Sequence, residues 1–166
     1  MFKGRTKWIL IGFLWLFGAN LLAGDTTQVS GFNHFTDSYD SIFSYFKFKK
    51  KPSINHFILN DSLFKTEFAS SNDKANPLFF DVYYKTYAYY IEKSFGKVFK
   101  KLHRKPFNYK RLELDESLRY PMSKNGDKIR VELLVSHKKN KAIITYYLWK
   151  VNGRWYLLEK FKFSKA

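Results

Sequence analysis

The chain has 166 residues, enough for one ordinary domain, and it contains no cysteine. Disulfides, thiolate metal sites and a cysteine nucleophile are therefore excluded. Lys and Arg number 30 against 14 Asp and Glu, a formal net charge of +16, which favours polyanionic partners such as nucleic acid, an anionic membrane surface or acidic envelope polymers. Aromatic residues make up 20% of the chain, enough to fill a large core or to line a cavity.

Residues 1–24 have the pattern of an export signal. Lys3, Arg5 and Lys7 form a positive start, and residues 8–23 form an uncharged apolar run. The run is close to the shortest length that spans a membrane, so an uncleaved N-terminal anchor is the alternative. Both predict a periplasmic or extracellular domain, which argues against nucleic acid as the partner. Residues 25–34 are expected to be a flexible lead-in, and residues 35–166 a single domain.

The first half of that domain predicts helices. Apolar residues recur every three or four positions from Phe35 to Phe46, and the basic run 47–52 ends this helix. Ser53 and Asp61 are predicted N-caps of one or two short helices. Pro77 suits the first turn of the longest predicted helix, which continues to about His103.

The second half predicts an antiparallel sheet of about four strands. Residues 109–114, continued by 118–120, form a weak first strand. In residues 129–135 every second residue is apolar, and the residues between them are Arg130, Glu132 and Leu134, which is the period of a half-buried strand. After a polar break at 138–141, residues 142–151 are β-branched and aromatic on both faces. Asn152-Gly153 suits a type I′ turn, and one last strand is predicted over 155–163.

Helices followed by strands predict an α+β fold, in which N-terminal helices pack on one face of a curved antiparallel sheet. The opposite face is also apolar. We therefore expect a ligand, a partner or a tail to cover it.

No pattern of catalytic residues is visible. The histidines at 34, 56, 103 and 137 share no spacing that would bring them to one metal ion. Glu113, Asp115 and Glu116 fall in a predicted turn, where solvated loop charges are the simplest interpretation. Serine-hydrolase and phosphate-loop patterns are absent. The prediction is a protein that is not an enzyme and has no metal or cofactor.

An apolar interior ringed by lysines would suit an amphiphile, because rings and aliphatic groups hold acyl chains while cations meet an anionic headgroup or membrane. A filled core without a ligand is the alternative. The residues of the predicted basic rim are Lys97, Lys100, Lys101, Arg104 and Lys105.

The pattern from residue 77 to residue 163 resembles a known family. A helix with Phe80, Tyr84 and Tyr87, the strands 129–135 and 142–149, and a turn before Trp155-Tyr156 are similar to the cone-shaped nuclear transport factor 2-like fold. Among exported bacterial members, the chain most resembles the toluene-tolerance/MlaC family of periplasmic phospholipid carriers. The resemblance implies that a phospholipid or another amphiphile lies inside the cone, against Tyr84, Tyr87, Ile91, Val131, Leu133, Ile144, Tyr146, Leu148 and Trp155.

The segment 53–76 is shorter than the corresponding helical region of that family, which implies a smaller cavity. The same fold also occurs in membrane-anchored scaffolds of secretion machineries. This resemblance implies the alternative function, an assembly or interaction module of the cell envelope that binds a protein partner and no ligand.

Overall fold

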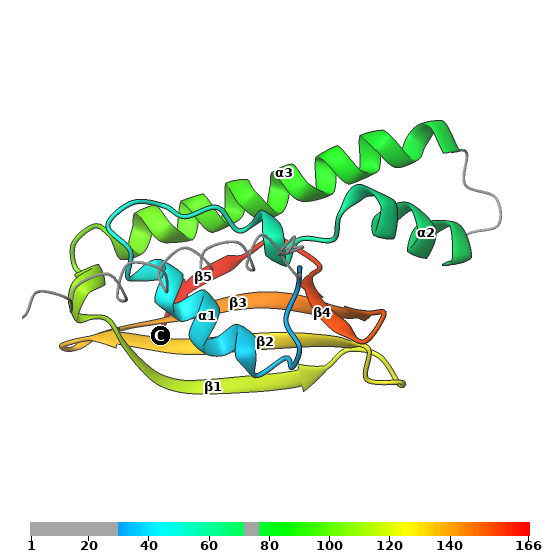
Figure 1. The fold of residues 1–166 in the computed structure, drawn as a ribbon. Helices are drawn as coiled ribbons and strands as arrows, with labels where there is room; N and C mark the ends of the chain where they lie inside the picture. The colour runs from blue at the N-terminus through cyan, green and yellow to red at the C-terminus, as the bar shows by residue number, and fades with distance from the viewer. Residues whose placement is uncertain (1–29, 72–76) are drawn as a thin grey trace, which may run out of the picture.

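The computed structural model describes residues 30–71 and 77–166, so the predicted leader at 1–24 lies outside the described residues. The described chain contains three α-helices and an antiparallel sheet of five strands (Figure 1). The predicted α+β class is confirmed. The sheet has five strands instead of about four, and the longest helix lies in the middle of the chain.

The helices are α1 (Asp37–Phe46), α2 (Asp61–Ser71) and α3 (Pro77–Leu102), with short 3-10 turns at Asn55–Phe57 and Tyr109–Arg111. The start of α3 at Pro77 and the end of α1 before the basic run confirm the predictions. The predicted cap at Asp61 is wrong, because the Asn60 side-chain oxygen accepts the Leu63 N–H at 2.8 Å. The cap thus lies one residue earlier.

The strands are β1 (Glu113–Pro121), β2 (Lys128–His137), β3 (Asn140–Val151), β4 (Arg154–Leu157) and β5 (Lys162–Lys165). Their order is β1-β2-β3-β4, and β5 also pairs with β3.

The first strand starts later than predicted. Residues 109–111 form a 3-10 turn because the Asn108 side chain accepts the Lys110 N–H at 3.1 Å. The acidic cluster expected in a turn lies in β1, where the register shifts between Leu114 and Glu116. This places Asp115 at a bulge.

The hairpin turn between β3 and β4 confirms its prediction. Asn152 and Gly153 have φ values of 48° and 79°, the positive values that both central residues of a type I′ turn require. The preceding hairpin is tighter than expected, since β3 already begins at Asn140 and Lys138 adopts a φ of 57°.

The last predicted strand is divided in two. β4 pairs with the end of β3 through Leu148 and Leu157, whereas β5 pairs with its first half through Ile144 and Phe163. Between these strands the chain leaves the ladder, and Phe161 is buried in the core. One long strand was therefore the wrong prediction.

The core lies between the helices and one face of the sheet (Figure 1). On β2 and β3 the buried side chains alternate with less buried ones, as a strand covered on one side requires. Full burial of such side chains contributes about 1.5–3 kcal/mol each. Residues from α1, α3, β2 and β3 that share this core include Ile42, Phe46, Ile91, Phe95, Val98, Leu102, Val131, Leu133, Ile144, Tyr146 and Leu148.

The described part of the predicted lead-in, residues 30–34, contacts β4. Phe32 is buried, and its backbone exchanges hydrogen bonds of 2.8 and 2.9 Å with Trp155. The Arg154 guanidinium donates to the Ser30 and Gly31 carbonyl oxygens and to the Asn33 side chain. The backbone bonds form a short antiparallel bridge beside β4.

The opposite face of the sheet is covered in part by the chain's own cations. The Arg130 guanidinium lies 4.2 Å from the Tyr120 ring centre, and Lys162 Nζ lies 5.0 Å from the Tyr147 ring centre and 2.8 Å from its hydroxyl. Lys128 lies over another ring of this face. Long basic side chains thus shield apolar surface that the sequence leaves without an obvious cover.

Candidate functional site: a cationic pocket beside α3

The residues predicted to contact a ligand lie mostly in the core. Those on β2 and β3 face the helices, and each is 0% exposed: Val131, Leu133, Ile144, Tyr146 and Leu148. Ile91 and Trp155 are also buried. The structure therefore brings them together as the sequence pattern predicts. Their contact with a ligand stays a prediction.

Aromatic side chains occupy the space between these residues and the helices. The Phe46 and Phe95 rings are 5.0 Å apart, Phe95 lies 5.4 Å from Phe161, and Phe161 lies 5.6 Å from Tyr146. These separations are those of directly packed rings. The Tyr146 hydroxyl is 2.8 Å from the Ser38 hydroxyl, and burial raises the pKa of Tyr146 above its ordinary value.

Tyr84 and Tyr87, also predicted to line the cone, instead join α3 to α2. Their rings lie 5.5 and 5.0 Å from the ring of Phe64. The Tyr87 hydroxyl donates to the Leu157 carbonyl and accepts the Leu59 N–H at 3.4 Å. Burial raises the pKa of Tyr87, so this hydroxyl remains protonated.

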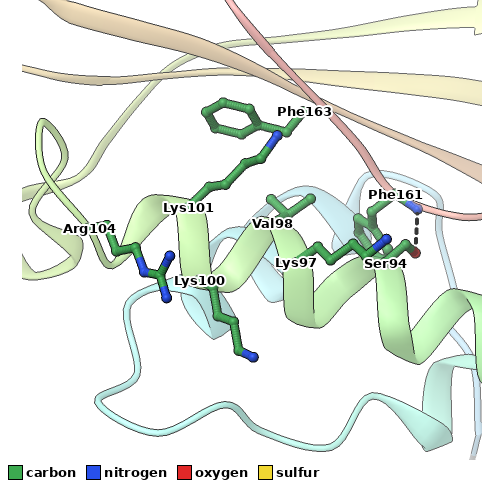
Figure 2. A pocket seen from close by; sticks show the side chains of 8 residues that line it. All are labelled: Ser94, Lys97, Val98, Lys100, Lys101, Arg104, Phe161 and Phe163. Carbon is green, nitrogen blue, oxygen red and sulfur yellow. Dashed lines mark hydrogen bonds between the residues drawn. The ribbon is translucent and has the colours of Figure 1, made fainter.

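A pocket of about 340 Å³ lies on the surface between the C-terminal half of α3 and β5 (Figure 2). Four of the five residues of the predicted basic rim line it, and Lys105 does not. Its lining residues are Ser94, Lys97, Val98, Lys100, Lys101, Arg104, Phe161 and Phe163.

The break between β4 and β5 builds the floor of this pocket. The Ser94 hydroxyl donates to the Ile91 carbonyl and accepts the Phe161 N–H, both at 2.8 Å, which anchors the break to α3 (Figure 2). Lys101 Nζ lies 4.7 Å from the Phe163 ring centre. The floor is thus apolar, with a cation held over one aromatic ring.

The charges around the pocket are all positive. Within residues 30–71 and 77–166, no carboxylate lies within ion-pair distance of Lys97, Lys100, Lys101 or Arg104. Lys100 and Lys101 occupy the last turn of α3, where the helix dipole favours cations. Lys97 precedes that turn and Arg104 follows it, so the dipole alone does not account for the cluster.

Four members of the pocket were not predicted as site residues: Ser94, Val98, Phe161 and Phe163. Phe161 and Phe163 lie in a segment that alternates like one strand, and Ser94 lies among apolar helix residues. No local signal joins them. Only the packing of the strand break on α3 makes them neighbours.

A second depression of about 260 Å³ lies further along α3, against the start of the same break. It is lined by Tyr87, Tyr90, Ile91, Leu158, Glu159 and Lys160. Its wall carries one acidic and one basic residue, so its charges offset each other. The pocket beside Lys97 is the one with a net charge.

Among the described residues, no group of three or more His, Asp or Glu side chains is placed to hold a metal ion. In the same part of the chain, every helix lacks either the length or the apolar character that crossing a bilayer requires.

Comparison with protein-family models, curated proteins and solved structures found no match to this chain. The relationship to the MlaC family and the cone-shaped fold stays a prediction.

Proposed function

We propose that this protein is a non-enzymatic binding protein of the bacterial cell envelope that recognises the anionic headgroup of a phospholipid-like amphiphile. The pocket between α3 and β5 carries this proposal. It combines an apolar floor with four cations that have no carboxylate partner among the described residues, the pairing that an anionic headgroup attached to an apolar chain requires.

The size of the pocket limits what it holds. Small-molecule sites have volumes of roughly 300–1,000 Å³, and this pocket of about 340 Å³ lies at the lower end. It suits a headgroup and the adjoining part of a chain, whereas two full acyl chains need more room. The rings packed between the helices and the sheet offer no comparable support for acyl chains inside the fold.

The direct test is titration with a short-chain phospholipid that stays monomeric. We expect dihexanoyl phosphatidylglycerol, which is anionic, to bind and to shift the amide resonances of α3 and β5, and dihexanoyl phosphatidylcholine to bind more weakly. Replacing both Lys97 and Lys101 by alanine should weaken binding about a hundredfold or more, because hydrogen bonds to charged groups contribute roughly 1.5–3 kcal/mol each.

The double variant Lys124→Ala, Lys150→Ala is the matched control, because it removes the same two charges from exposed positions at the end of the sheet opposite the β2–β3 hairpin. Equal binding of both lipids, or an equal loss in the control and the pocket variant, would show general charge attraction and contradict the proposed site.

The exposed edge of the sheet favours the alternative function, an envelope assembly module that binds a protein partner. On and beside β1, Leu118, Tyr120 and Met122 are 40%, 37% and 49% exposed. In the described sheet β1 pairs only with β2, so its outer edge has backbone groups that a partner strand can bind. Native mass spectrometry that finds a folded protein without any bound amphiphile would favour this alternative.

A further inference from the structure

One exposed stripe runs along α3 on the side opposite the core. At ~100° per residue, the buried side chains of α3, such as Ile91 and Val98, project to one side. The stripe comprises residues of the opposite side and of the flank next to it that adjoins the pocket, and all of them are exposed: Val82, Tyr83, Thr86, Tyr89, Tyr90, Lys93, Lys97, Lys100 and, just past the helix end, Arg104.

The two halves of the stripe differ in chemistry. The N-terminal half is aromatic and apolar, with Val82, Tyr83, Tyr89 and Tyr90 exposed by 61%, 58%, 55% and 54%. Single exposed apolar residues are ordinary, but a row of them along one helix face marks an interaction surface. The C-terminal half is cationic and includes three residues that also line the pocket.

The two halves meet at Lys93. Its Nζ donates to the Tyr89 hydroxyl at 2.8 Å and lies 4.9 Å from that ring centre, and the Tyr89 and Tyr90 rings are 5.6 Å apart. Aromatic rings with polar tips beside lysines are the side chains that favour the headgroup layer of a membrane.

The acidic residues of α3 lie away from the stripe. Asp81 binds Lys65 of α2 at 2.5 Å, and Glu92 projects from the flank opposite Lys97. The stripe therefore carries only positive charge, which complements an anionic surface. The 26-residue helix extends roughly 39 Å, so the stripe is a long line of exposed side chains on one helix rather than a concave groove.

We propose that the outward face of α3 docks on an anionic membrane surface, with its tyrosines in the headgroup layer and its cations on lipid phosphates. This inference rests on the proposed function in that the same pocket then opens at the membrane and receives one headgroup. Docking along a plane accounts for the length and single charge sign of the stripe, which an acidic protein partner would not require.

Vesicle co-sedimentation of the full chain tests this inference. The probes are phosphatidylcholine vesicles with and without about one-third phosphatidylglycerol. We expect binding only to the anionic vesicles. Lys93→Ala should weaken it about fivefold, as expected for one cation near such a surface. The double variant Val82→Ser, Tyr90→Ser should also weaken it, while short-chain phosphatidylglycerol still binds in the pocket.

Tyr120→Ser is the matched control, since it removes an exposed tyrosine from β1, outside the stripe. Circular dichroism of each variant verifies that it is folded. Binding of the Val82 and Tyr90 variant at the wild-type level would overturn the docking face, whatever the result with the short-chain lipid.

The remaining outcomes separate the two proposals. Normal vesicle binding with no short-chain binding would refute the pocket and leave the docking face. Failure of the wild type to bind the anionic vesicles would by itself overturn membrane docking, and stripe-dependent binding to an acidic protein would then favour a protein partner.

Discussion

The hydrogen bond between Ser38 and Tyr146 tests whether the interior beneath the sheet is packed or hollow. Both residues are 0% exposed, and their hydroxyl oxygens are 2.8 Å apart. The Ser38 hydroxyl donates its proton to the Phe35 carbonyl at 2.6 Å, so the Tyr146 hydroxyl is the donor in the bond between them.

Ser38→Ala removes the acceptor of a fully buried donor, and we expect a loss of about 2 kcal/mol in the free energy of unfolding. Tyr146→Phe removes the donor while Ser38 keeps its bond to Phe35, so the expected loss is about 1 kcal/mol. The double variant leaves no unpaired donor. It should be about 1 kcal/mol less stable than the wild type, and more stable than Ser38→Ala alone.

Equilibrium unfolding in urea, followed by the fluorescence of Trp149 and Trp155, measures all four proteins. Effects that add, or a Ser38→Ala loss below about 0.5 kcal/mol, would mean that water or a ligand already reaches the Tyr146 hydroxyl. Either result would refute the packed interior and favour a lipid-filled cone.

Three further predictions concern stability. Leu133→Trp should lower the free energy of unfolding by about 1–3 kcal/mol because it overpacks a fully buried position, and wild-type stability in a thermal melt would indicate room beneath the sheet. Burial lowers the pKa of His56 below its ordinary 6.5, so the free energy of unfolding should fall as the pH decreases through about 6.5. Urea unfolding curves of His56→Gln should show a weaker fall over this pH range, and an equal fall would mean that His56 does not cause it. Gly31→Ala should cost more stability than Gly126→Ala in urea unfolding, because both glycines have positive φ but only at Gly31 would a new Cβ lie 2.8 Å from the Tyr156 ring; equal losses would contradict this difference.

The local elements could be predicted because their causes are local. Pro77 starts α3 since its missing N–H costs nothing in a first turn, and Asn152-Gly153 makes a turn that needs positive φ at both positions. The N-cap of α2 was missed by one residue because Asn60 and Asp61 are both good caps. Neighbouring residues with equal propensity leave the boundary open.

Part of the candidate site could also be predicted. The basic rim was found because Lys97, Lys100 and Lys101 follow the helical period beside an apolar face. The apolar partners of those cations were expected beneath the sheet, where the structure packs rings against rings. Their actual partners come from Phe161 and Phe163, which are about 60 residues further along the chain.

The sequence by itself determined the class of the fold, the long helix, the central hairpin and the single sign of charge near residue 100, because periodicity, turn chemistry and composition are properties of neighbouring residues. Only the tertiary structure decided where the last predicted strand divides into β4 and β5, and that the residues at this break form the floor of the pocket. The registers of β4 and β5 on β3 differ by two residues, and a shift of two preserves which side chains face inward. Alternation therefore continues through the break, and only packing against Ser94 reveals the pocket.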